Sequence, residues 1–524
     1  MMLSRSYALH IGLLLCGCLL ILYHPLEKMD FPGGLGDEGA HTRVANQIAN
    51  TGVWWKLEYQ GEPYMNKPPL KLWLSALTFR FIGKSLFWVR FWDATFAVAT
   101  ILVVYLWGRI VIHPLTGLVG SMILLLSYNY VYVHCATTGV QDSAMIFFFT
   151  LALTCFYQSS RFPWLQYIAG CAMGCCSLTK GWMGIGALII IMGFLVISRQ
   201  RFVWNTKVFY LMVGISFCIP LLWFLPNLFF LSGFFQNAFV FNYLSRITGK
   251  EVPRHIKPWY YYFTVLYKNF SPWVWLLPLA TIFGCLKAFA KKDKLSLFLL
   301  IWMITIFVGF SAASGKQAWY INPAFPAMSL LIGYFLYETG LMMYQPKLSR
   351  YAPLFVLMLS IGMILLIINT AVALYRIPNN QKTKARPLES FVSYIEKKFH
   401  NDPYQIILCD LNMNSKVVSN REHYYFNRIG KQLIQIDDDL VQFNAIIHHA
   451  TIPIFAIMPE KTFLEFLGYD DFQLGDGVYI LSNDKGEIVK LVMPYRLPKD
   501  RKLPLRKYRT SVKREKEVVN NGKR

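Results

Sequence analysis

Long uninterrupted apolar runs dominate this 524-residue sequence and limit what it can fold into. The runs include 8–23, 185–197 and 354–374, and several of them approach the roughly 20 apolar residues that a helix needs to cross a bilayer. Hydrophobic residues make up 55% of the chain and charged residues 15%, against about 45–50% and about 25% in soluble domains. The sequence therefore predicts a polytopic α-helical membrane protein.

We expect about 11 membrane spans, within a range of 10–13. Arg5 precedes the first apolar run, but His24-Pro25 follows it in place of a small-x-small cleavage site, so we interpret that run as a retained span. Basic residues fall in alternate loops, which places those loops in the cytoplasm. The expected spans are residues 7–23, 87–107, 114–132, 143–158, 164–179, 183–198, 208–230, 273–290, 295–311, 322–341 and 351–374.

The chain changes character after the last expected span. We assign residues 1–375 to a transmembrane catalytic domain, with the first extracytoplasmic loop at 24–86, and residues 376–494 to a small soluble α/β domain on the outer face. The latter has a helical pattern at 388–399 and short apolar runs at 405–409, 451–458 and 477–481, which are typical of strands. The basic tail, 495–524, is either solvated or in contact with anionic lipid head groups.

Several functional classes are disfavoured. A net charge of +23 would suggest a nucleic-acid partner in a soluble protein, but the positive-inside bias explains much of it here, so we expect no nucleic acid. Most of the ten cysteines lie in or beside apolar runs, which implies no disulfide framework. The sequence has no Walker A motif, GxSxG elbow or zinc-spaced cluster, and we expect no cofactor.

Asp37 and Glu38 form an acidic pair in the glycine-rich first outer loop, in the segment GLGDEGAHTRVANQIANTG. One interpretation is that they favour the start of a short helix through its dipole. The other is that a carboxylate partly screened from water has a pKa adjusted for proton abstraction from an acceptor. Asp142 presents a similar choice, because it opens an apolar run on the same predicted side, and helix capping and a functional role remain open for it.

Cations on the outer side suggest an anionic ligand. Lys180 interrupts an apolar stretch, and an ionisable residue at such depth indicates function. Lys316 and Tyr320 lie in a similar outer turn. Lys67, before two prolines, either holds an ammonium at the interface or snorkels at an ordinary junction.

The outer loop 231–272 adds further basic residues, among them Arg246 and His255, followed by Trp259-Tyr260-Tyr261-Tyr262. The basic residues suit either phosphate contact or a solvated loop. The aromatic residues suit an interfacial belt or a sugar platform. A lipid that carries phosphate and sugar would satisfy both groups.

Together these motifs resemble the GT-C superfamily of membrane glycosyltransferases, and within it the family of the aminoarabinose transferases of lipid A and the protein O-mannosyltransferases. The resemblance covers roughly residues 1–375 and depends on the order, spacing and predicted sidedness of the motifs. The segments that carry it are GDEGAH, YMNKPPLKLWL, FWVRFWDATFAV, GVQDSAM, SLTKGWMG, PRHIKPWYYY and SGKQAWYINPAFPA.

The resemblance implies transfer of one sugar from a polyprenyl-phosphate donor to lipid A, another glycan or lipid, or a protein hydroxyl. It places the enzyme in a bacterial inner membrane, among membrane lipids, with its site facing the periplasm or cell exterior. The family's first-loop catalytic carboxylate matches Asp37, with Glu38 and His255 supporting, and its second acidic position matches Asp142, which we also expect to be catalytic. The residues that receive the lipid phosphate match Lys67, Lys180, Lys316 and Tyr320, to which we add Arg246.

Two positions depart from the aminoarabinose transferases. Asn66 replaces the Glu before the KPP segment, and Tyr243 replaces a loop His. Because those positions are associated with metal in that subgroup, we expect no bound metal, and the aminoarabinose specificity is not implied. With cations at the donor phosphate and Asp37 on the opposite face of the anomeric carbon, a single displacement predicts inversion.

A lipid-linked sugar transporter or flippase is the alternative from another class. It predicts charges near span midpoints and an internal repeat. The sequence instead concentrates charge in outer turns and has no evident repeat.

Overall fold

The computed structural model describes residues 2–26, 37–200 except 60, 203, 206–240 except 239, and 255–343, together with part of a helix within 357–373 and five strands beyond residue 404. The chain forms two compact units, which are described separately. The first comprises Met1–Lys28 and His41–Asn379, and the second Met29–Ala40 and Asn380–Arg524.

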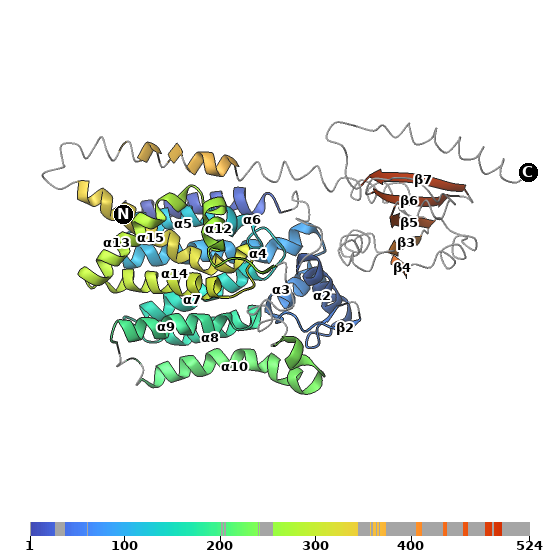
Figure 1. Ribbon diagram of the computed structural model, residues 1–524, viewed down its shortest axis with the longest axis horizontal. Coiled ribbons are helices and arrows are strands. Elements are labelled where there is room, and N and C mark those ends of the chain that lie inside the picture. The colour runs from blue at the N-terminus through green and yellow to red at the C-terminus, as the bar shows by residue number, and fades with distance from the viewer. Residues whose placement is uncertain are drawn as a thin grey trace, which may run out of the picture. The chain divides into compact units, whose positions relative to one another are not determined.

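Helices make up almost all of the described part of the first unit (Figure 1). Its α-helices are α1 (Met2–Cys18), α2 (Asp37–Thr51, which begins in the second unit), α3 (Leu70–Phe81), α4 (Leu86–Val111), α5 (Pro114–Leu125), α6 (Tyr128–Tyr132), α7 (Asp142–Gln158), α8 (Leu165–Lys180), α9 (Met183–Ile197), α10 (Lys207–Phe230), α12 (Tyr261–Asn269), α13 (Leu277–Cys285), α14 (Lys294–Ala312) and α15 (Phe325–Met343). Short helical segments of other types are η1 (Leu19–Tyr23), η5 (Trp273–Trp275), η6 (Leu286–Ala290) and η7 (Ala318–Ala324), and β1 (Glu58–Tyr59) pairs with β2 (Glu62–Pro63).

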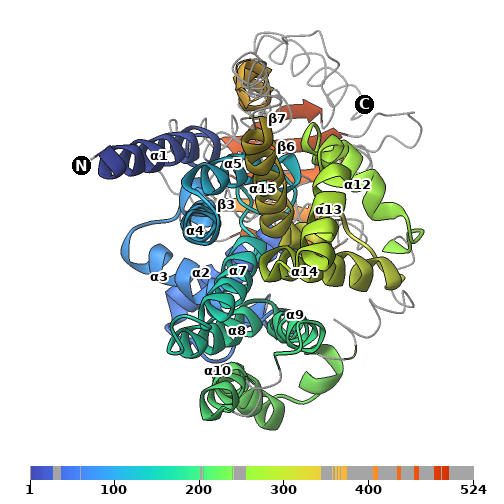
Figure 2. The same ribbon diagram turned by 90° about the vertical axis from the view of Figure 1, so that its left-hand side faces the viewer.

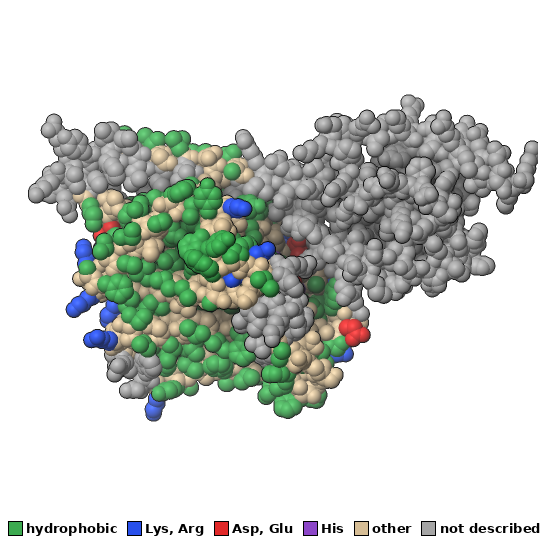
Figure 3. All heavy atoms as spheres, viewed as in Figure 1, with side chains coloured by type: hydrophobic (Ala, Val, Ile, Leu, Met, Phe, Trp, Pro, Cys, Tyr) green, Lys and Arg blue, Asp and Glu red, His purple; other side chains and the backbone are tan. Residues whose placement is uncertain are grey.

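Four of the described helical segments are long and apolar enough to cross a membrane: Phe87–Val111, Lys207–Phe230, Trp273–Ala290 and Lys294–Ala312. They coincide with four of the expected spans. Figure 3 shows hydrophobic side chains over most of the visible face of the helical unit, with many of the Lys and Arg side chains near one end. A backbone hydrogen-bonded within helices is what a lipid environment requires.

Neighbouring helices pack closely along their lengths. Figure 2 looks roughly along several of them and shows α8 between α7 and α10, both of which it contacts extensively. At Gly170 on α8, a Cβ atom would lie 2.6 Å from the Met212 carbonyl oxygen of α10. Glycine therefore permits this approach, as small residues commonly do between membrane helices.

Two expected spans have different bounds. Residues 114–132 do not form one helix, because α5 ends at Leu125 and Ser127 takes an extended conformation (φ −81°, ψ 114°) before α6. The Ser127 hydroxyl donates to the Ile123 carbonyl at 2.6 Å and satisfies an acceptor at the helix end. The last well-described helix, α15, starts at Phe325 and not at 322, because the 3₁₀ segment η7 contains Pro323.

The second unit contains a five-stranded mixed sheet with the order β4-β3-β5-β6-β7. β3 (Gln405–Asp410) is parallel to β4 (Leu433–Asp437) and β5 (Ile454–Pro459), whereas β6 (Gly477–Asp484) is antiparallel to β5 and β7 (Glu487–Pro494). The three predicted strands are confirmed, and β4 and β7 were not predicted. The helix expected at 388–399 and the basic tail lie outside the described residues.

Candidate active site

The start of one helix and the end of another bring together an acidic and a basic candidate residue. α7 begins at Asp142, and α8, which packs against it, ends at Lys180. α8 stops there because Gly181 adopts φ 61°, a conformation that favours glycine. A carboxylate at a helix N-terminus and an ammonium at a C-terminus both interact favourably with the helix dipoles. The fold thus joins two candidates that are 38 residues apart in the chain.

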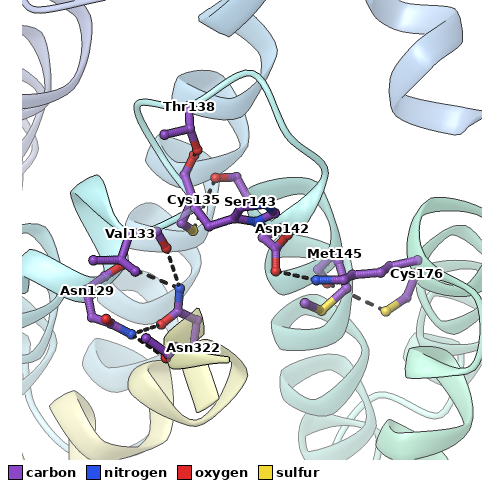
Figure 4. A network of polar contacts seen from close by, with 12 residues as sticks. Asn129, Val133, Cys135, Thr138, Asp142, Ser143, Met145, Cys176 and Asn322 are labelled. Carbon is purple, nitrogen blue, oxygen red and sulfur yellow. Dashed lines mark hydrogen bonds and ion pairs between the residues drawn. The ribbon is translucent and has the colours of Figure 1, made fainter. Parts of the chain in front are cut away.

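Asp142 is a buried acid with both carboxylate oxygens engaged. The Lys180 Nζ atom lies 2.5 Å from Oδ1, and the His134 Nδ1 atom lies 3.0 Å from Oδ2. The Asp142 side chain is 2% exposed and that of Lys180 is 18% exposed. Gln141 occupies the N-cap position and forms no side-chain cap bond, so the capping interpretation of Asp142 is not what the structure has. Figure 4 shows Asp142 and one of these contacts at the start of α7.

Aromatic rings of η7 complete the surroundings of Lys180. The Lys180 Nζ atom lies 5.8 Å from the Tyr320 ring centroid, within the range of a cation–π contact. The Trp319 ring contacts Tyr320 edge to face at 6.1 Å and stacks on His134 at 4.1 Å with an interplanar angle of 9°. Asp142, Lys180 and Tyr320, three predicted site residues, therefore lie together.

Lys316 and His255 also lie together, in a short antiparallel contact between two loops. The Lys316 backbone N–H donates to the His255 carbonyl at 2.8 Å, and Ile256 bridges Gly315. The Lys316 ammonium donates to the Lys257 carbonyl at 3.0 Å and to the Ala313 carbonyl. Burial lowers the pKa of this ammonium. Lys316 thus holds the two loops together in addition to carrying charge.

Lys67 lies near the start of α3, at a loop that contacts the Asp142 turn. The Pro68 carbonyl accepts a hydrogen bond of 3.1 Å from the Gln141 side-chain amide. Pro68 and Pro69 are buried, whereas Lys67 is partly exposed. The KPP segment and the GVQD segment are therefore joined through the residues next to Lys67 and Asp142.

Buried amides anchor η7, the segment that carries Trp319 and Tyr320. The Asn129 side-chain amide donates to the Ala318 carbonyl at 3.0 Å and to the Asn322 side chain at 2.5 Å, and Asn269 donates to Asn129 at 2.9 Å. Figure 4 shows Asn129 and Asn322 facing each other. Since buried amides are costly unless paired, this network fixes α6, η7 and the end of α12 together.

The sequence interpretation missed four residues of this region. His134 contacts Asp142 and Trp319 contacts Tyr320, whereas Gln141 bonds to Pro68 beside Lys67 and Asn129 anchors η7. Gln141 and Trp319 lie within segments already singled out, one residue before Asp142 and Tyr320. His134 could have been identified from its imidazole in an outer turn, eight residues before Asp142.

The remaining candidates belong to the second unit or lie outside the described residues. Asp37 and Glu38 open α2, within the second unit, and Glu38 is buried. Their place beside the Asp142 cluster stays a prediction. Arg246 and Tyr243 lie outside the described residues, whereas Asn66 is described and exposed.

Sequence comparisons relate the chain to known membrane glycosyltransferases. A family profile described as dolichyl-phosphate-mannose-protein mannosyltransferase matches residues 66–229, which include Lys67, Asp142 and Lys180. Undecaprenyl phosphate-alpha-4-amino-4-deoxy-L-arabinose arabinosyl transferase 1 of Pseudomonas fluorescens is 24% identical over 343 residues, or 63% of this chain and 60% of that protein. An uncharacterized Aquifex aeolicus protein is 27% identical over 311 residues, or 58% and 60%. The chain thus spans about three fifths of the length of these relatives.

Solved structures share the architecture. ArnT from Cupriavidus metallidurans bound to undecaprenyl phosphate has a TM-score of 0.69 at 17% identity, with 91% of this chain and 98% of that chain covered. The oligosaccharyltransferase AglB from Archaeoglobus fulgidus has a TM-score of 0.55 at 12% identity, with 94% and 75% covered. The fold is that of the GT-C membrane glycosyltransferases. Within this class, the chain resembles the aminoarabinose transferase and protein O-mannosyltransferase family, as the sequence predicts.

Proposed function

We propose that this protein is a glycosyltransferase that moves a single sugar from a polyprenyl-phosphate donor to an acceptor. The observation that carries the proposal is the Lys180 ammonium, fixed between Asp142 and the Tyr320 ring, inside the segment that matches the mannosyltransferase family. A partly exposed cation in a largely buried cluster suits a phosphate, because electrostatic attraction is strong where water is scarce. The relative named as an undecaprenyl-phosphate-dependent arabinosyl transferase supports this donor class.

The donor phosphate would be held by Lys180, Lys67 and Lys316, with Arg246 as a further cation. Lys180 contacts the Tyr320 ring, and Lys316 lies two residues before η7, the segment that carries Tyr320. Positive charge that is already in place stabilises the negative charge on the departing polyprenyl phosphate. The bond that breaks joins the anomeric carbon to a phosphate oxygen, and its electron pair leaves with the phosphate.

Asp37 would act on the acceptor. An acceptor oxygen attacks the anomeric carbon from the face opposite the phosphate, and its proton passes to the Asp37 carboxylate, with Glu38 and His255 supporting the site. We assign Asp142 a different role in the site. Because both of its oxygens are engaged by Lys180 and His134, it is suited to hold the ammonium in place and not to abstract a proton.

The acceptor is lipid A, another glycan or lipid, or a protein hydroxyl. The family described as protein mannosyltransferase favours the last. Asn66 and Tyr243 depart from the aminoarabinose subgroup, so we propose no sugar more specific than a pentose or hexose. We place the site and the C-terminal sheet unit at the periplasmic or outer face of a bacterial inner membrane, because the basic loops between helices favour the opposite side as cytoplasmic.

A flippase is not supported. Its expected pattern is an internal repeat with discontinuous helices, whereas named relatives are transferases and the shared fold is that of glycosyltransferases.

The test is transfer by the purified protein in lipid nanodiscs. Radiolabelled undecaprenyl-phosphate sugars are incubated with lipid A, glycolipid and peptide acceptors, and nucleotide sugars serve as the control donors. We expect labelled acceptor with at least one polyprenyl-phosphate sugar. Transfer from nucleotide sugars alone would overturn the proposal.

A further inference from the structure

His134 has an unusual backbone for its residue type. It lies in the turn between α6 and α7 with φ 55°. Positive φ values are uncommon outside glycine and are tolerated best by Asn, Asp and His. The conformation directs the imidazole to two partners at once, because Nδ1 contacts Asp142 and the ring face lies on Trp319.

These contacts close a ring of interactions around the site. Asp142 contacts Lys180, Lys180 lies over Tyr320, Tyr320 contacts Trp319, and Trp319 stacks on His134, which returns to Asp142. The five side chains come from the 134–142 turn, the end of α8 and η7. His134 joins the aromatic side of the ring to the carboxylate of Asp142, as Tyr320 joins it to the ammonium of Lys180.

We propose that His134 is a positioning residue for the donor phosphate, and this inference rests on the proposed function. Its Nδ1–H donates to Oδ2 of Asp142, since a carboxylate can only accept. With Oδ2 occupied, the carboxylate plane is fixed and Oδ1 is presented to Lys180. The Lys180 ammonium is then held over Tyr320 at the place where a phosphate would bind.

Two matched variants separate the hydrogen bond from the ring stacking. His134→Asn keeps an N–H donor at the same position along the side chain and tolerates positive φ, but it removes the ring. His134→Phe keeps a ring against Trp319 and removes the donor. If the ring stacking is what matters, His134→Asn should impair donor binding more than His134→Phe. If the hydrogen bond to Asp142 is what matters, His134→Phe should impair it more.

We expect His134→Phe to raise the KM for the polyprenyl-phosphate sugar by about tenfold, which is the effect of losing one hydrogen bond to a charged group. The acceptor KM and kcat should stay within about threefold of the wild type by the same reasoning. His134→Asn should keep the donor KM within about threefold. If His134→Phe does not yield folded protein, His134→Gly, which relieves the backbone, serves as the variant that lacks the side-chain N–H. His134→Asn should then have a lower KM for the sugar donor than His134→Gly.

An unchanged KM for the sugar donor in the variant that lacks the side-chain N–H would overturn the inference. Equal rises in the KM values for the sugar donor and the acceptor would overturn it as well. Binding of undecaprenyl phosphate without a sugar, measured by calorimetry on the wild type, separates failure of the proposed function from failure of the role given to His134. A wild type that neither binds this lipid nor transfers sugar contradicts the proposed function. A wild type that does both, with a Phe variant that matches it, contradicts only the role of His134.

Discussion

Removing Lys180 should destabilise the protein through the charge it leaves behind on Asp142. At 2.5 Å and an effective dielectric constant of about 20, the gross attraction between two unit charges is about 7 kcal/mol, most of which offsets desolvation. Removing one partner of a buried pair costs about 3–5 kcal/mol. Because the Lys180 side chain is 18% exposed, we expect Lys180→Met to lower the free energy of unfolding by about 3 kcal/mol, near the lower end of this range.

A double-mutant cycle measures this coupling directly. Lys180→Met, Asp142→Asn and the double variant are heated in the same nanodiscs at one scan rate, and unfolding is followed by tryptophan fluorescence. We expect the double variant to lose at least about 2 kcal/mol less than the sum of the single variants, because residues in one ionic network couple.

Lys56→Met is the matched control. The Lys56 Nζ atom lies 2.8 Å from Oε1 of Glu58, and the two side chains are 49% and 26% exposed, respectively. Lys56 lowers the pKa of Glu58, yet exposed pairs contribute only about 0–1 kcal/mol. Additive losses in the Lys180 cycle, within about 0.5 kcal/mol, would refute the assignment of Asp142 and Lys180 as a coupled buried pair.

Three further predictions concern the same site. Burial lowers the pKa of Lys316, so its charge is lost at a lower pH than that of an exposed lysine. The kcat/KM for the donor should fall as pH rises through this lowered pKa, and Lys316→Arg should move that fall to higher pH, whereas an unmoved profile would contradict a phosphate contact. Asn129→Ala removes partners of Asn269 and Asn322 and should cost about 2–4 kcal/mol, measured by the same thermal assay; a loss below about 0.5 kcal/mol would contradict the anchoring of η7. NMR of the transferred sugar should show inversion at the anomeric carbon, and retention would contradict a single displacement.

The fold class followed from the sequence because long apolar runs need lipid around them. The exact helix ends did not, since 114–132 carries no charged residue and nothing in its hydropathy marks the extended backbone at Ser127. β4 and β7 were missed because LIQID and EIVKLVMP carry charges at or within short runs.

The sequence supplied part of the candidate site. Asp142, Lys180, Lys316 and Tyr320 were identified one by one, from charge and position in outer turns. The contact between Asp142 and Lys180 depends on α7 and α8 packing side by side, and the contact of Asp142 with His134 depends on the His134 backbone; neither can be seen in a linear pattern. The sequence therefore suggests a catalytic role for Asp142, whereas we propose a positioning role because Lys180 and His134 engage both of its oxygens.

The measurement that tests the central claim most directly is single-turnover sugar transfer by Asp37→Asn, with Glu38→Gln as the neighbouring control. With a polyprenyl-phosphate sugar that the wild type uses, Asp37→Asn should lower the rate by at least about 100-fold, the range expected for loss of a general base, with donor binding unchanged. Glu38→Gln should remain far more active. Full turnover by Asp37→Asn would contradict the assignment of Asp37 as the residue that activates the acceptor.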